Sequence, residues 1–254
     1  MVVEAKLKTT SPLWAFVLAS LRAAFSFRGQ FLISGISMTI TNMSLYLPIY
    51  YLSLANGGFG LFSHEIITMG VAISLLSFTI CVNFTMGVVD LQEIILSGKL
   101  DLFLLRPISL YQHLLMYRMN VFMIGEFIGS FLLLLLNPLH NWPYIFLASI
   151  IGGILFNHLI VLFNLTPFFF HQQREHTAWE TVLTFHIYPP TIYTDFGRFV
   201  ALYIFPGAMT SYGMLYLLVN PGFIWIFAPF YVGIIVLTHI LLHMGIRKYT
   251  SAGY

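Results

Sequence analysis

Six long apolar runs divide this sequence, and their length limits what the chain can fold into. The runs cover about residues 31–54, 66–89, 111–136, 144–166, 198–219 and 223–244. A helix of about 20 apolar residues crosses the hydrocarbon of a bilayer, where backbone groups must bond within the chain. Only 8% of the 254 residues are charged, against roughly 25% in soluble domains. The runs predict an all-α integral membrane protein of six transmembrane helices in one domain, residues 1–254.

The positively charged residues predict how the six helices are oriented. With six spans, every lysine and arginine falls on the side of the termini, and the three opposite loops contain none. The eleven residues are Lys6, Lys8, Arg22, Arg28, Lys99, Arg106, Arg118, Arg174, Arg198, Arg247 and Lys248. Because cytoplasmic loops carry an excess of Lys and Arg, we expect both termini to be cytoplasmic. The segment 90–110 between spans two and three, and the loop 167–197 between spans four and five, should be cytoplasmic too.

The ends of the chain are expected to lie at the cytoplasmic surface. Residues 1–30 include the helix-forming stretch "PLWAFVLASLRAAFSFR" at 12–28. With 17 residues and Arg22 inside it, this stretch fits a helix along the membrane interface better than a seventh span. Residues 245–254 are predicted to form a cytoplasmic tail.

The loop at 167–197 has a mixed composition. Its middle, 175–186, could form an amphipathic helix, and Pro189 and Pro190 would stop that helix because a residue before proline avoids helical geometry. We expect this helix to lie at the interface as well, so that spans five and six occupy 198–244.

Common catalytic and nucleotide-binding motifs are missing from the sequence. A P-loop requires G-x-x-x-x-G-K-[ST], but the only Gly-Lys pair, Gly98-Lys99, is followed by Leu100. The sequence has no G-x-S-x-G, H-E-x-x-H or C-x-x-C motif, and the single Cys81 excludes an internal disulfide. We expect no catalytic residue, no bound metal and no cofactor in this chain.

Two features keep other functions open. His239 and His243 share one helix face at i, i+4, which would suit a metal or haem in a membrane enzyme or redox subunit. Glu126 lies well inside a predicted span, where an ionisable group is costly and is a functional candidate by default. It could be the proton site of an ion-coupled transporter, line a transport pathway, lie at a dimer interface, or bond a neighbouring asparagine for packing. Gly125 and Gly129 beside it allow close helix approach.

The segment between spans two and three concentrates charge in a chain that has little of it. The charged residues in or beside it are Asp90, Glu93, Lys99, Asp101, Arg106 and Arg118. The pattern predicts a short helix from Leu91 to Ser97 that stops at Gly98, and a second one that ends before Pro107. A short amphipathic element held between two spans is a shape that a partner protein could push on, although a solvated loop would have a similar composition.

Three stretches in order along the chain decide between these interpretations. "IILSGKLDLFLLRPISLYQHLL" at 94–115 resembles the I-x-x-G-x-L-D-x-x-L-L-x-R-P signature of permeases of bacterial ATP-binding-cassette exporters of the second type. "FHIYPPTIYTDFGRFVALYIFPGAMTSY" at 185–212 is similar to the Y-P-x-x-I-Y element and following span of that family. The C-terminal "GIRKYTSAGY" resembles its third conserved stretch.

The resemblance implies an architecture and a set of partners. A cytoplasmic interfacial helix would precede six spans, and a coupling helix between spans two and three would dock on a separate ATPase subunit that binds ATP and Mg²⁺. A second permease subunit, identical or related, and membrane lipid would complete the assembly in the bacterial cytoplasmic membrane, without nucleic acid. The coupling residues would be Asp90, Glu93, Gly98, Lys99, Asp101, Arg106 and Pro107, with Asp101 and Arg106 foremost. The cargo stays open.

Overall fold

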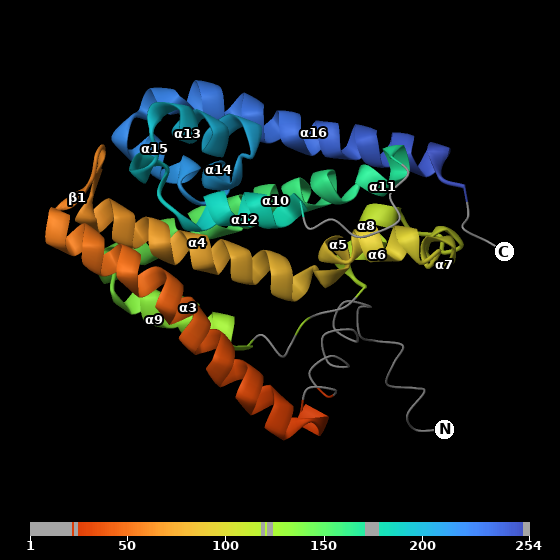
Figure 1. Ribbon diagram of the computed structural model, residues 1–254, viewed down its shortest axis with the longest axis horizontal. Coiled ribbons are helices and arrows are strands. Elements are labelled where there is room, and N and C mark those ends of the chain that lie inside the picture. Colours follow the sequence, from red (N-terminus) through yellow and green to blue (C-terminus); the bar gives the residue numbers. More distant parts are fainter. Residues whose placement is uncertain (1–21, 23–24, 118–119, 121–123, 171–177, 251–254) are drawn as a thin grey trace.

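The computed structural model describes residues 22, 25–117, 120, 124–170 and 178–250, which form a bundle of helices with one small β-hairpin (Figure 1). The predicted all-α class is confirmed for this part of the chain. Most of the predicted interfacial helix at 1–30 lies outside the described residues; Arg28 already begins the first long helix.

Within the described part of the chain, four helical stretches are long and apolar enough to span a membrane, and they correspond to predicted spans one, two, four and six. They are Arg28–Asn56 (α3), His64–Phe84 (α4), Leu139–Phe169 and Pro221–Lys248. The third stretch contains η2 (Leu139–Asn141), α10 (Trp142–Asn164) and α11 (Thr166–Phe169), and the fourth contains η5 (Pro221–Phe223) and α16 (Ile224–Lys248).

Helices α4 and α10 form the centre of the bundle, between α3 on one side and α16 on the other (Figure 1). In their most apolar windows 72% and 67% of residues are buried, against 22% in α3 and 11% in α16. Small residues bring the central pair together. A Cβ atom at Gly153 of α10 would lie 3.1 Å from the Ser77 carbonyl oxygen of α4. The outer helices therefore present their remaining apolar surface to the surroundings of the chain.

The third predicted span, 111–136, is not one helix. The short helix α8 (Leu110–Leu115) is followed by Met116 as its C-cap residue. Beyond it, the backbone amide of Asn120 donates a hydrogen bond to the Asn83 carbonyl of α4 at 3.0 Å. Helix α9 (Ile124–Leu135) then has 12 residues, or about 18 Å at 1.5 Å per residue, which is shorter than the ~30 Å hydrocarbon core. Apolar length alone predicts one continuous helix over this run, so the break could not be seen in the sequence pattern.

The helix expected within 167–197 is packed into the bundle and does not lie only at its surface. Helix α12 (Ala178–Ile187) packs against α4, α10 and α14 (Gly207–Ser211), and its residues Val182 and His186 are fully buried. The chain then continues into η3 (Pro190–Ile192). This short helix lies next to the β-hairpin, because Thr191 is beside Gly60 of the hairpin turn. Part of the expected surface loop is thus a core element of the bundle.

The fifth predicted span, 198–219, is also wrong as a continuous helix. It is divided among α13 (Asp195–Phe199), the π-helix η4 (Val200–Ile204), α14 and α15 (Gly213–Val219). Pro206 has no amide hydrogen to continue the helix. Gly207 then packs so closely on α12 that a Cβ atom would overlap the Val182 carbonyl oxygen.

Hydrogen bonds from side chains hold this broken part against α4. The His186 carbonyl oxygen accepts from Ser74 Oγ at 2.9 Å and from Ser211 Oγ at 2.6 Å. Tyr212 donates its hydroxyl hydrogen to the Ile187 carbonyl at 3.2 Å. His186 Nε2 in turn donates to the Ser74 carbonyl at 2.8 Å. The last carbonyls of α12, which have no partner within the helix, are thereby satisfied.

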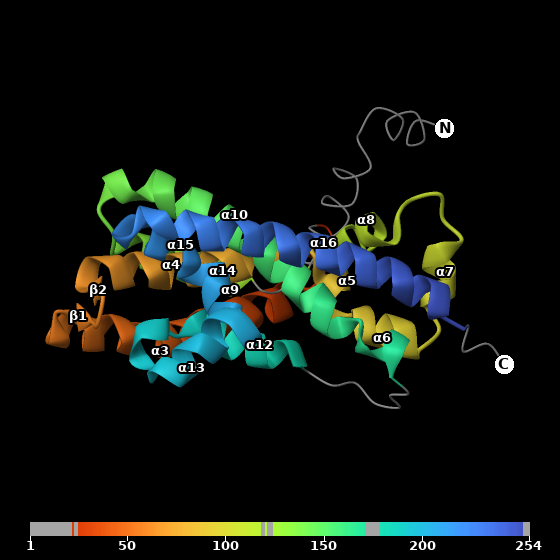
Figure 2. The same cartoon turned by 90° about the horizontal axis from the view of Figure 1, so that it is seen from above.

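The two ends of the bundle differ in structure. At one end, β1 (Gly58–Phe59) and β2 (Phe62–Ser63) pair antiparallel between α3 and α4; we refer to this as the hairpin end. The opposite end carries α5 (Met86–Val89), α6 (Leu91–Leu96), α7 (Leu100–Leu104) and α8, and we refer to it as the α7 end. Both views show this separation (Figures 1 and 2).

The positive charges do not all gather at one end. Among the described residues, Lys99 and the pair Arg247–Lys248 lie at the α7 end, where Lys248 Nζ is 5.3 Å from the centre of the Phe169 ring. Arg198, however, lies on α13 in the hairpin half and pairs with Asp195 at 3.5 Å (Figure 1). The expected one-sided distribution is therefore wrong at Arg198, because the chain has already crossed to the hairpin end through α12.

Close glycine packing joins α9 to α3, and it makes a testable prediction. A Cβ atom at Gly125 would overlap the Gly35 carbonyl oxygen, whereas one at Gly129 would lie 3.3 Å from Leu75 and fit with a small shift. Gly125→Ala should lower the free energy of unfolding in mild detergent by about 1–3 kcal/mol, and Gly129→Ala, the matched control, should change it less. Equal unfolding curves for the two variants would contradict this packing.

Candidate functional site

The charged segment between α4 and α8 folds as its sequence predicts. Helix α6 ends at Leu96, Gly98 follows with φ of +71°, and α7 ends at Leu104, three residues before Pro107. Glycine is favoured at this left-handed position because it has no Cβ atom. Asp90 lies at the junction of α5 and α6. We refer to residues 90–107 as the α6–α7 segment.

An exposed ion pair closes the turn between α6 and α7. Lys99 Nζ lies 2.5 Å from Glu93 Oε1, with both side chains about half exposed. The hydrogen bond to Glu93 raises the pKa of Lys99 above its ordinary value. An exposed pair of this kind contributes little to stability, so its main effect is to present both charges at the tip of the segment.

Arg106 is held at the exit of the segment by a histidine. Its Nη1 lies 3.0 Å from Nε2 of His113 on α8, and because arginine only donates, this nitrogen of His113 accepts. The His113 ring lies 4.0 Å from that of Phe103, centre to centre. Arg106 and His113 also line a pocket of about 280 Å³. Asp101 lies in the first turn of α7 and is partly buried.

Apolar side chains beside these charges are exposed at the α7 end. Leu102 is 65% exposed, Leu105 82% and Ile108 44%; we call these three residues the apolar patch. Lys99 precedes the patch along the chain, and Arg106 lies between Leu105 and Ile108. A mixed surface of apolar side chains bordered by charges has the composition of a protein-binding surface.

Buried amides connect α5, which leads into the α6–α7 segment, to α10, and connect α6 to α11. Asn164 Nδ2, at the end of α10, donates to the Val88 and Val89 carbonyls at 2.9 and 3.1 Å. Gln92 Nε2 donates to Thr166 Oγ1 of α11 at 3.0 Å. These residues were missed as site residues, although an amide near the end of an apolar run is a visible signal. Through them, a displacement of the segment would act directly on α10 and α11.

Glu126 is buried inside the chain. Its Oε2 accepts a hydrogen bond from Asn83 Nδ2 of α4 at 2.9 Å, and its backbone carbonyl accepts from Ser130 Oγ at 2.7 Å. Of the alternatives that the sequence left open for Glu126, a hydrogen bond to a neighbouring asparagine is present, and that asparagine is Asn83. Gly125 packs on α3 of the same chain.

The histidine pair of the cofactor hypothesis is arranged differently from expectation. The ring of His239 lies beside that of His158 of α10, with ring centres 5.6 Å apart and the planes tilted by 36°. No group of three or more His, Cys, Asp or Glu side chains that could hold a metal occurs among the described residues. The i, i+4 pair of His239 and His243 thus gains no acidic or cysteine ligand within this part of the chain.

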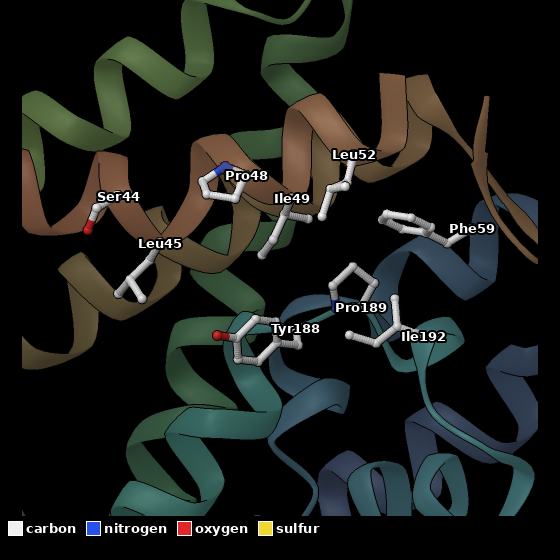
Figure 3. A pocket seen from close by; sticks show the side chains of 9 residues that line it. All are labelled: Ser44, Leu45, Pro48, Ile49, Leu52, Phe59, Tyr188, Pro189 and Ile192. Carbon is white, nitrogen blue, oxygen red and sulfur yellow. The ribbon is translucent and has the colours of Figure 1, made fainter. Parts of the chain in front are cut away.

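An apolar pocket of about 230 Å³ lies near the hairpin end, between α3 and the segment that follows α12 (Figure 3). In Figure 3 the side chains of Pro48, Ile49 and Leu52 face Tyr188, Pro189 and Ile192 across it. The other lining residues are Ser44, Leu45 and Phe59. The hydroxyl groups of Ser44 and Tyr188 lie among apolar side chains in this lining. Such a lining suits the apolar chain of a ligand better than it suits catalysis.

Comparison with known proteins agrees with this architecture. A family model described as "ABC-2 family transporter protein" matches residues 31–253. The chain belongs to the ABC-2 transporter family. Membership identifies it as a multi-pass membrane permease of an ABC transporter, a transport subunit rather than an enzyme, and implies an ATP-binding partner. Searches of curated proteins and of solved structures found no match.

The bond between Asn83 and Glu126 gives a second testable prediction. Asn83→Leu leaves a buried carboxyl group without this donor, which should cost about 1–3 kcal/mol of stability. Combining it with Glu126→Leu removes both polar groups and should recover most of the loss. Unfolding of the single and double variants in detergent measures the coupling, and strictly additive losses would show that the two groups do not interact.

Proposed function

We propose that this ABC-2 family member is the membrane-spanning permease subunit of an ATP-driven exporter in the bacterial cytoplasmic membrane. A separate nucleotide-binding subunit binds ATP and Mg²⁺ and hydrolyses ATP, and its motion drives the cargo outward. A second permease subunit, identical or related, completes the membrane domain. The observation that carries this proposal is the α6–α7 segment, with its exposed apolar patch and charges.

The surface of the segment suits a protein partner. Leu105 is 82% exposed, and three apolar side chains close together in sequence would be covered by a docked subunit. The nearby Lys99 and Arg106 would steer an acidic surface into place. Asp90, Glu93 and Asp101 bring negative charge to the same segment, so an oriented fit is possible.

The connections of the segment suit the transmission of force. Asn164 bonds the last turn of α5 to α10, and Gln92 bonds α6 to α11. Phe168 of α11 packs on Gly245 of α16. A partner that pushes on α6 and α7 would move the ends of α10 and α16 together, which is how the bundle would switch between inward-facing and outward-facing states.

The orientation follows from the positive residues at the α7 end. Lys99, Arg106, Arg247 and Lys248 favour a cytoplasmic α7 end under the positive-inside rule, and both termini would be cytoplasmic. Arg198 opposes this bias, but it is one positive residue against these four. The ATPase would then meet the α7 end where ATP is available.

The second permease subunit would contact the outside of the bundle. Glu126, Gly125 and Gly129 are used in contacts inside the chain, so they contribute to the pathway or to the interface only through neighbouring helices. The least buried long helices, α3 and α16, have apolar surface available for that subunit and for lipid.

A third prediction tests the docking surface. Leu105→Glu should weaken retention of the ATPase subunit in mild-detergent purification by about tenfold or more, because a charge replaces an apolar contact. Leu139→Glu, at a leucine 74% exposed in the hairpin half, is the matched control and should retain the ATPase. Loss in both variants, or in neither, would contradict docking at the α7 end.

A fourth prediction tests coupling. Asp101→Arg and Arg106→Glu should each lower ATP-driven transport in reconstituted vesicles by about tenfold while the protein stays folded. Asp195→Arg reverses a charge whose side chain is 99% exposed at the other end, and it should leave transport unchanged. Normal transport in both segment variants would refute a coupling role for these residues.

A further inference from the structure

A pocket of about 390 Å³ lies between α4, α8 and α10 in the half of the bundle nearer the α7 end. Its volume is in the range of small-molecule sites, about 300–1,000 Å³. Phe84 and Ile154 at its edge are 42% and 43% exposed, so the pocket opens on the side of the bundle. None of its described lining residues is Asp, Glu, Lys or Arg, which disfavours a charged ligand there.

The polar groups of this pocket contain more acceptors than donors. His158 Nδ1 lies 2.8 Å from the Ile154 carbonyl, so this nitrogen carries the hydrogen and Nε2 accepts. The Tyr111 hydroxyl lies 2.7 Å from Asn157 Oδ1 and 3.2 Å from His158 Nε2. A hydroxyl has one hydrogen, so it can satisfy only one of these two acceptors at a time.

A second histidine, His239, lies next to two lining residues of the pocket. His239 Nδ1 donates to the Ile235 carbonyl at 2.9 Å, which leaves its Nε2 as an acceptor. Its ring centre lies 5.1 Å from that of Tyr111 and 5.6 Å from that of His158. A ligand that brings hydroxyl hydrogens would satisfy these nitrogens, whereas a ligand with only acceptor oxygens would not.

Residues that precede and follow the α6–α7 segment in the chain line this pocket. Thr85, which accepts a hydrogen bond from Asn157 Nδ2 at 2.6 Å, caps α4 just before the chain leaves for α5. Tyr111 lies on α8, just after the chain returns. A ligand between these residues would contact the chain where the segment departs and where it rejoins the bundle.

We infer that this pocket binds the hydroxyl-bearing head of a neutral amphiphile, with its apolar tail along Phe84, Ile154 and the neighbouring lipid. That this amphiphile is the cargo of the exporter rests on the proposed function. Binding to α8 and Thr85 would then link the presence of cargo to the position of the α6–α7 segment.

Photolabelling of the purified full-length chain in phosphatidylcholine nanodiscs tests the site. The probe is a monoacylglycerol with a diazirine in its acyl chain, and labelled peptides are identified by mass spectrometry. Because the diazirine is in the acyl chain, the label should concentrate on α4 and α10, along which the tail is placed. Unlabelled 1-oleoylglycerol should compete about tenfold better than methyl oleate, which has no hydroxyl group, as expected for one or two hydrogen bonds.

Variants separate the polar site from simple lipid contact. Asn157→Leu and His158→Phe should abolish the preference for 1-oleoylglycerol. Ile154→Trp fills the pocket from its partly exposed edge and should remove the label from α4 and α10 without disturbing the polar groups. Ser149→Ala, a buried serine of α10 that bonds only the Ile145 carbonyl among its described partners, should label like the parent.

The outcomes are decisive in either direction. Label spread over the lipid-facing helices, equal competition by the ester, or label that persists in Ile154→Trp would overturn the assignment. The assay contains neither ATPase nor ATP, so such a failure would leave the exporter proposal intact. A chain that binds the monoacylglycerol here but does not associate with an ATPase would instead keep the site and refute its role as a cargo site.

Discussion

The hydrocarbon of a membrane offers no hydrogen bonds to a polypeptide, and this constraint decides where the chain can be broken. Most of the long apolar helices meet this constraint through the hydrogen bonds of their own backbone. The break after α12 does not, and there Ser74, Ser211 and Tyr212 supply donors to the carbonyls of His186 and Ile187, which have no partner within the helix. The fold thus depends on a few hydroxyl groups at one place where the backbone cannot satisfy itself.

The same chemistry joins the bundle to the segment that we assign to coupling. Asn164 satisfies the two last carbonyls of α5, and it does so from the end of the most buried part of the bundle. A bond to a backbone carbonyl at a helix end is both a cap and a mechanical connection. If the segment moves, α10 must move with it or the carbonyls lose their donor, which is costly away from water.

Sequence patterns predicted what depends on composition and on local geometry. Four long helices followed from apolar length, and the two short helices around Gly98 followed from a glycine that tolerates positive φ. The path of the chain over 167–219 was not predicted from the sequence, because a continuous helix and a broken helix have the same average apolarity. Pro206 and the buried His186 were signals of the break, but the pairing of His186 with Ser74, 112 residues away, is a tertiary contact.

Site-specific photocrosslinking in living cells tests the central claim that an ATPase acts on the α7 end. A photoreactive amino acid would replace Leu105 in one variant and Trp225, which is 82% exposed like Leu105 but lies near the hairpin end, in another. The account predicts that position 105 captures a protein whose sequence contains a G-x-x-x-x-G-K-[ST] P-loop, and that position 225 does not. Capture of that protein only from position 225, or of lipid alone from both positions, would contradict it.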